Sequence, residues 1–149
     1  MVKIKFENDD QIGGMGGPFV SNLFINKVKI RNKYLSDHYV ISENQNYYLF
    51  STYLPNTKNI IKFKLFGFIP WRTNWFCFKI LVYSVKENLF YLQNECQNYL
   101  FIESKKDESI FYYKAFHNGI EEYFSKISFN LVNFSKYTFE ELSEKTNIT

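Results

Sequence analysis

Residues 76–85 are apolar on both sides of an extended chain, and this run constrains the fold more than any other segment. One side carries Phe76, Phe78, Ile80 and Val82, and the other carries Cys77, Leu81, Tyr83 and Val85, with Lys79 as the only charge. Successive side chains of a β-strand point to opposite faces of its sheet, so such a run predicts an inner strand that is covered on both faces. We therefore expect residues 76–85 to lie in the centre of a β-rich core.

Short alternating or apolar segments, separated by polar turn clusters, fill most of the remaining chain. This pattern is typical of antiparallel sheets. The segments that we predict as strands are 2–6, 23–30, 39–41, 47–53, 61–65, 89–92, 99–102, 110–116 and 128–132, with a turn at 8–10 and a hairpin turn at 42–46. The sequence predicts one domain over residues 1–149, a sandwich or a partly open barrel, with residues 145–149 as a frayed tail.

Two segments near the C-terminus carry helix signals. Asn118 and Glu121 have the spacing of a capping box, but Asn118-Gly119 is also a strong hairpin signal. We favour a helix here, because a hairpin would place Glu121 and Glu122 on opposite faces of one strand; the hairpin stays open as the alternative. Thr138 with Glu141 is a clearer capping box. The predicted fold class is therefore mainly β (α+β), with one or two short C-terminal helices.

The sequence offers few groups for catalysis or metal binding. His38 and His117 lack metal-ligand spacing. His38 could serve as the base for Cys77, or His117 for Cys96, only if the fold brought the pair together. Two cysteines this far apart predict neither a disulfide scaffold nor a metal cluster, and we expect Cys77 to be a free thiol that packs as a small hydrophobe. We predict no enzymatic activity, no cofactor and no metal.

The charge of the chain is mild and unevenly distributed. The net charge is +3, with 10 basic and 5 acidic residues in the first 75 positions and 8 basic and 10 acidic residues in the rest. Nucleic-acid binders have a stronger basic bias, and this chain has only two arginines, Arg31 and Arg72. The pattern argues against nucleic acid as a partner. The chain also lacks the pattern of a signal peptide or a membrane helix, so we expect a cytoplasmic protein without a membrane partner.

A glycine-rich segment, residues 13–17, precedes Pro18. Phosphate-binding loops use glycine so that backbone amides can approach a phosphate at the start of a helix. Here the spacing fits no such motif, and the segment that follows alternates like a strand. We therefore interpret it as a connection that needs positive φ angles.

Residues 71–75 contain Trp71, Arg72 and Trp75, and tryptophan and arginine dominate many binding hot spots. The alternative interpretation is that both indoles cap the core beside the inner strand. The aromatic side chains could also stack on the bases of a single-stranded nucleic acid beside lysines, and the residues concerned would be Tyr47, Tyr48, Trp71, Trp75, Lys62 and Lys64.

The chain resembles the small cytoplasmic immunity proteins of bacterial polymorphic-toxin and type VI secretion systems. The resemblance lies in the glycine loop before a strand, the many short aromatic strands, and the closing segment 126–134. It implies a protein that binds one cognate toxin and blocks its active site without catalysis. Inhibitors of basic nuclease toxins are usually acidic, whereas this chain has a pI near 8.7, so the resemblance implies a neutral or acidic toxin, or contact through the acidic C-terminal half alone.

Two surfaces are candidates for the toxin contact. One is the aromatic segment with Trp71, Arg72 and Trp75, and the other is the polar face that carries Glu121 and Glu122. Aromatic and arginine anchors carry more binding energy than carboxylates at the rim of an interface. We therefore expect the aromatic segment to contribute more. A binding domain for a small ligand or for single-stranded nucleic acid is the alternative function.

Overall fold

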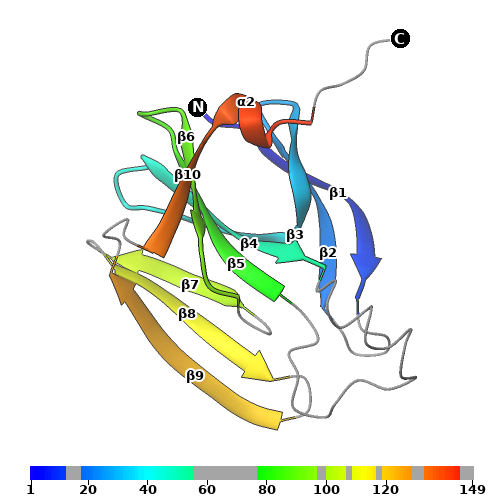
Figure 1. Ribbon diagram of the computed structural model, residues 1–149, viewed down its shortest axis with the longest axis vertical. Helices are drawn as coiled ribbons and strands as arrows, with labels where there is room; N and C mark the ends of the chain where they lie inside the picture. Colours follow the sequence, from blue (N-terminus) through cyan, green and yellow to red (C-terminus); the bar gives the residue numbers. More distant parts are fainter. Residues whose placement is uncertain are drawn as a thin grey trace.

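The computed structural model describes residues 1–12, 18–55, 77–96, 100–106, 109–116, 119–128 and 133–144. These residues form two antiparallel sheets and one short helix (Figure 1). The seven-stranded sheet has the order β1-β2-β3-β4-β5-β6-β10, and the three-stranded sheet has the order β7-β8-β9. The elements are β1 (Ile4–Gln11), β2 (Phe19–Ile25), β3 (Val28–Ile41), β4 (Tyr47–Leu54), β5 (Cys77–Ser84), β6 (Leu89–Gln93), β7 (Phe101–Lys106), β8 (Ser109–Phe116), β9 (Gly119–Ser128), β10 (Phe134–Thr138) and α2 (Phe139–Leu142). The predicted class, mainly β and antiparallel with a short C-terminal helix, is confirmed.

Strand β5 lies between β4 and β6, and every residue in it except Lys79 is buried. Its alternate side chains enter two separate hydrophobic clusters, one on each face of the sheet. Phe78, Ile80 and Val82 belong to the cluster that includes Ile102 of β7, which we call the sheet-side cluster. Leu81 and Tyr83 belong to the cluster that includes Leu142 of α2, which we call the helix-side cluster. The prediction of an inner strand covered on both faces is confirmed.

The seven-stranded sheet curls around the helix-side cluster, and α2 closes one end of the curl (Figure 1). Thr138 is the N-cap of α2, its side chain accepts a hydrogen bond from the Glu141 amide, and the Glu141 carboxylate accepts one from the Thr138 amide. The chain then returns to β3, where the Glu144 amide donates to the Lys29 carbonyl at 2.9 Å. The predicted capping box and final helix are therefore confirmed.

A bend in β3 brings the two sheets together. Tyr34 pairs with Thr52 and Tyr39 pairs with Phe50, so five residue steps on β3 face only two on β4. The extra residues include Asp37, which has a φ of 53°, and they turn the strand toward β7. Bulges of this kind bend a strand and increase its twist.

Three sequence predictions are corrected by the strand boundaries. Residues 8–10 do not end the first strand; β1 continues through them with a register shift, and Asn8 has a φ of 59°. The predicted strand 23–30 is two strands, because Asn26 and Lys27 both have positive φ angles and form a tight turn between β2 and β3. The hairpin across residues 42–46 is confirmed.

The third correction concerns the segment after Asn118. Residues 119–128 form β9, which pairs antiparallel with β8, so the favoured helix is wrong and the hairpin alternative is right. The helical spacing of apolar residues was outweighed by pairing with β8, and isolated periodicity over so few residues is easily overridden by tertiary contacts.

Candidate functional site

The structure places the predicted binding residues in two different situations. Trp71, Arg72 and Trp75 lie outside the described residues, as do the glycines of residues 13–17, so the aromatic hot spot stays a prediction. Glu121 and Glu122 lie in β9 rather than on a helix. The helix on which these two residues were expected to share a polar face is therefore wrong, whereas their contact with a partner stays a prediction.

The two cysteines form a disulfide bond with each other, which corrects the expectation of two separate thiols. Cys77 begins β5 and is buried, whereas Cys96 follows β6 and is exposed, and their Cα atoms are 5.0 Å apart. The bond is possible because β6 returns antiparallel to β5. This return brings Cys96 next to Cys77, although the two residues are 19 positions apart in the sequence. Because a disulfide has no thiolate, neither cysteine is available as a nucleophile in this state.

His38 sits at the contact between the two sheets. Its ring stacks on Phe101, with the ring centroids 3.8 Å apart, and its Nε2 lies 2.7 Å from the Ile102 carbonyl oxygen. A carbonyl can only accept, so Nε2 carries the hydrogen and donates it. Burial lowers the pKa of His38, and the hydrogen bond to Ile102 partly opposes that shift. Together with Ser51, whose hydroxyl donates to the Leu100 carbonyl at 2.7 Å, His38 joins β7 to the larger sheet.

Tyr47 and Tyr48, which could have stacked on bases, do not form one platform. They are adjacent in β4 and therefore point to opposite faces, with Tyr48 in the helix-side cluster and Tyr47 packed against the sheet-side cluster. Tyr48 is buried at 6% exposure. The aromatic residues described here mainly fill the core, and the lysines expected beside them, Lys62 and Lys64, lie outside the described residues.

A groove lies beside β1. It has a volume of about 610 Å³, and it is lined by Lys3, Ile4, Lys5, Glu7, Phe24 and Lys27. Lys5 pairs with Phe24 and Glu7 pairs with Asn22 across the β1–β2 ladder, so these side chains share one face of the sheet. The groove therefore has an apolar floor at Phe24 and lysines at its rim. We call it the β1 groove.

Among the described strands, only β2 pairs with the backbone of β1. The Asn26 amide donates to the Lys3 carbonyl at 2.9 Å, and the Asn26 side-chain oxygen accepts from the Lys3 amide at 3.0 Å. Residues in an antiparallel pair alternate between bonded and non-bonded positions, so Lys5 and Glu7 also face β2. Ile4 and Phe6 then direct their amides and carbonyls away from β2, toward the outer edge.

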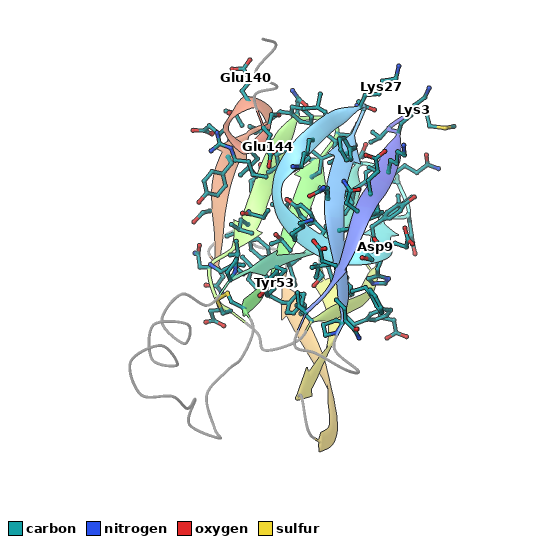
Figure 2. All side chains as sticks on the ribbon, turned by 90° about the vertical axis from the view of Figure 1, so that its right-hand side faces the viewer. Lys3, Asp9, Lys27, Tyr53, Glu140 and Glu144 are labelled. Carbon is teal, nitrogen blue, oxygen red and sulfur yellow. A yellow bond between two sulfur atoms is a disulfide. The ribbon has the colours of Figure 1, made fainter. Side chains whose placement is uncertain are left out.

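The charges around the β1 groove are not balanced. Glu7 forms an ion pair with Lys5. For Lys3 and Lys27, the described part of the chain supplies no carboxylate within ion-pair distance. Figure 2 shows both lysines at one end of the β1–β2 pair, directed toward solvent, with Asp9 farther along β1. The groove is therefore a basic site with an apolar floor.

The opposite face of β1 continues the helix-side cluster. Ile4 and Phe6 pack against it, and the Phe6 ring stacks on Tyr39 of β3 with centroids 6.2 Å apart. Tyr39 and Ile41 remain 37% and 42% exposed. The edge of the sheet at β1 thus has lysines on one face and partly exposed apolar side chains on the other.

Sequence reasoning found the strand but not the groove. The alternation of residues 2–6 indicated a half-buried strand with basic residues on one face, which β1 has. What it could not indicate is that β1 is an edge strand, because the order of strands depends on pairing between distant segments. The turn at Asn26 and Lys27, which brings Lys27 to the groove, was the signal that the sequence analysis missed.

Comparison of the chain with protein-family models, with curated proteins and with solved structures gave no match. Within the described ranges, no helix has the length and apolar character needed to span a membrane. In the same ranges, His, Cys, Asp and Glu side chains do not gather in groups of three or more that could hold a metal ion.

Proposed function

We propose that this chain is a protein-binding domain and acts as an immunity protein, which binds a cognate antibacterial toxin and blocks the toxin's active site without catalysis. The observation that carries the proposal is the Cys77–Cys96 bond. It removes the thiol from both nucleophile–base pairs that the sequence offered, while His38 is engaged between the sheets. The resemblance to immunity proteins then supplies the specific role.

The compartment is part of this proposal. The sequence indicated a cytoplasmic protein, and that location stays a prediction. The disulfide counts against it, because such bonds persist in oxidising compartments and are rare in the cytoplasm. Trapping free thiols with an alkylating reagent at the moment of cell lysis distinguishes the two. Unlabelled cysteines in the native cell support an oxidising compartment, and complete labelling supports the cytoplasm.

The test of the function uses the protein encoded next to this chain. We expect a toxin gene to lie directly upstream of it. Co-expression should restore growth to cells that produce the toxin, and calorimetry should give a complex of defined stoichiometry. Full toxin activity in the presence of a saturating amount of this protein would contradict the proposal.

The aromatic segment enters the same experiment as a candidate contact. If Arg72 is a hot-spot residue, Arg72→Ala weakens toxin binding by about 2 kcal/mol or more, and Glu121→Ala has a smaller effect. The alternative, binding of single-stranded nucleic acid, would instead show as a gel shift that disappears steeply as salt is added.

A further inference from the structure

The outer edge of β1 presents backbone groups that no described strand uses. Strand β1 is first in the order of its sheet, and β2 is its only partner among the described residues. Ile4 and Phe6 turn their amides and carbonyls to that outer edge, as the alternation from the Lys3–Asn26 hydrogen bond requires. An unpaired edge of this kind is a template on which another extended chain can add as a strand.

The side chains beside the edge determine which segment fits. Lys3 and Lys5 lie on the face of the β1 groove, whereas Ile4 and Phe6 lie on the face of the helix-side cluster. A strand added to β1 would place its alternate side chains beside these two sets. Acidic side chains are favourable beside the lysines, and apolar side chains would cover the exposed flank of Phe6 and its neighbour Tyr39.

The geometry points to β1 as the docking strand for an extended segment of the protein partner in which acidic and apolar residues alternate. The main chain of that segment pairs with Ile4 and Phe6, and its carboxylates contact Lys3 and Lys27, which have no described acidic partner. This inference rests on the proposed function, because it assigns the partner to the toxin, and it names the surface and the chemistry of the contact.

A second copy of this chain fits the edge less well. Its own β1 would offer Glu7, which is already paired with Lys5, and its strand is interrupted after that residue by the bulge at Asn8. Bulges and lysines on an edge strand are features that discourage pairing between identical edges. An acidic segment from a different protein brings no second bulge and no facing lysines, and it pairs with β1 before the bulge at Asn8.

The first experiment uses the full chain and a short synthetic peptide that alternates glutamate and valine. Amide exchange is followed residue by residue by NMR. We expect the peptide to slow exchange at the amides of Ile4 and Phe6 and to leave the Lys5 amide unchanged, because Lys5 already donates toward β2. This alternate pattern separates strand addition from a purely ionic contact, which would shift signals of the lysines without protecting alternate amides.

The second experiment compares two charge reversals. Lys27→Glu changes the rim of the groove, and Lys86→Glu makes the same change at an exposed position in the turn between β5 and β6. Binding of the glutamate peptide should weaken about tenfold at low salt in Lys27→Glu and remain unchanged in Lys86→Glu. A peptide that alternates lysine and valine should instead bind more tightly to Lys27→Glu than to the wild-type protein.

Several outcomes would overturn the inference. One is saturable peptide binding with no protection of Ile4 or Phe6. Another is protection of these amides that grows with protein concentration alone, which would identify a second copy as the occupant. A third is a toxin complex whose affinity is unaffected by Lys27→Glu; that result would leave the immunity function standing. If the toxin itself does not bind while the peptide does, the proposed function fails and the docking edge remains.

Discussion

The two edge strands of the larger sheet, β1 and β10, end the same curled sheet in different ways. In β10, the Asn94 amide donates to the Asn133 carbonyl, so by alternation Phe134, Lys136 and Thr138 face the outer edge. The Thr138 amide is nevertheless satisfied, because the Glu141 carboxylate of the capping box accepts it at 2.6 Å. Strand β10 is shorter than β1, and its last outward amide is closed by its own chain.

Strand β1 has no such closure among the described residues. It is longer than β10, its outward amides belong to Ile4 and Phe6, and a groove with lysines at its rim runs beside it. The difference shows how a local motif can close the end of one edge, although Phe134 and Lys136 of β10 also face outward. The groove and its lysines favour β1 over β10 as the docking edge, and the following changes test that contrast.

The largest effect is expected at the centre that both edges share. Leu81 of β5 is buried in the helix-side cluster, to which Ile4 and Phe6 of β1 and Tyr137 of β10 also contribute. Leu81→Ala should lower the free energy of unfolding by about 2–5 kcal/mol, because it leaves a cavity in a packed core. Denaturant unfolding measures the loss, with Lys86→Ala in an exposed turn as the control. A loss below about 1 kcal/mol would mean that the site collapses or that the core is elsewhere.

The next largest effect, loss of the disulfide, should change the stability of β10 and leave that of β1 almost unchanged. The Cys77–Cys96 bond ties the start of β5 to the chain just after β6, which is the strand that carries β10. Cys96→Ser should cost about 3 kcal/mol, because the bond closes a loop across 19 positions of the sequence. Hydrogen exchange should become faster in β6 and β10 and change little in β1. Wild-type protein under reducing conditions should behave in the same way, and equal loosening of both edges would contradict the contrast.

A smaller effect is expected at the capping box itself. Thr138→Ala removes the side chain that accepts from the Glu141 amide, and loss of an N-cap threonine typically costs about 1 kcal/mol. Exchange of the amide at position 138 should become faster, while the amides of Ile4 and Phe6 keep their wild-type rates. Thr138→Ser, which retains the hydroxyl, is the matched control and should restore most of the protection.

The smallest effect depends on pH. Hydrogen bonds from the Thr138 amide and then the Thr138 hydroxyl lower the pKa of the Glu141 carboxyl below its ordinary value. A carboxyl whose pKa is lower in the folded state than in the unfolded chain binds fewer protons when the protein is folded. Its contribution to the free energy of unfolding is therefore fully present above the ordinary carboxyl pKa, and it is lost as the pH falls through the folded pKa. An NMR titration of the Thr138 amide should therefore show a midpoint below 4.5. A midpoint at or above that value would show that the box is open in solution.

The sequence predicted the parts of the fold whose signals are local or strongly periodic. Residues 76–85 predicted β5 because burial on both faces leaves a continuous apolar run, and Thr138 with Glu141 predicted α2 because a capping box is complete within four residues. Strand β1 was also predicted from a local periodic signal, which is the alternation of lysines with apolar residues.

The remaining features depend on contacts between distant residues. The Cys77–Cys96 bond could not be inferred from spacing, since it depends on how the β5–β6 hairpin returns. The strand at 119–128 was missed because its apolar residues have a clear helical spacing in the local sequence. Its pairing with β8 leaves no comparable local signal. For the candidate site, lysines on a strand were evident, but their position at a free edge required the order of all seven strands.

The bend in β3 carries a consequence for how the length of this chain can change among its relatives. Ile30 and Tyr34 point into the helix-side cluster from even positions before the bend, whereas Tyr39 contacts Tyr48 and Phe50 on that same face from an odd position after it. Loss or gain of a single residue between Tyr34 and Tyr39 would therefore turn the Tyr39 ring to the other face of the sheet. In an alignment of related sequences, gaps at this bend should come in pairs of residues, and a gap of one residue should coincide with an exchange of polar and apolar character at positions 39 to 41.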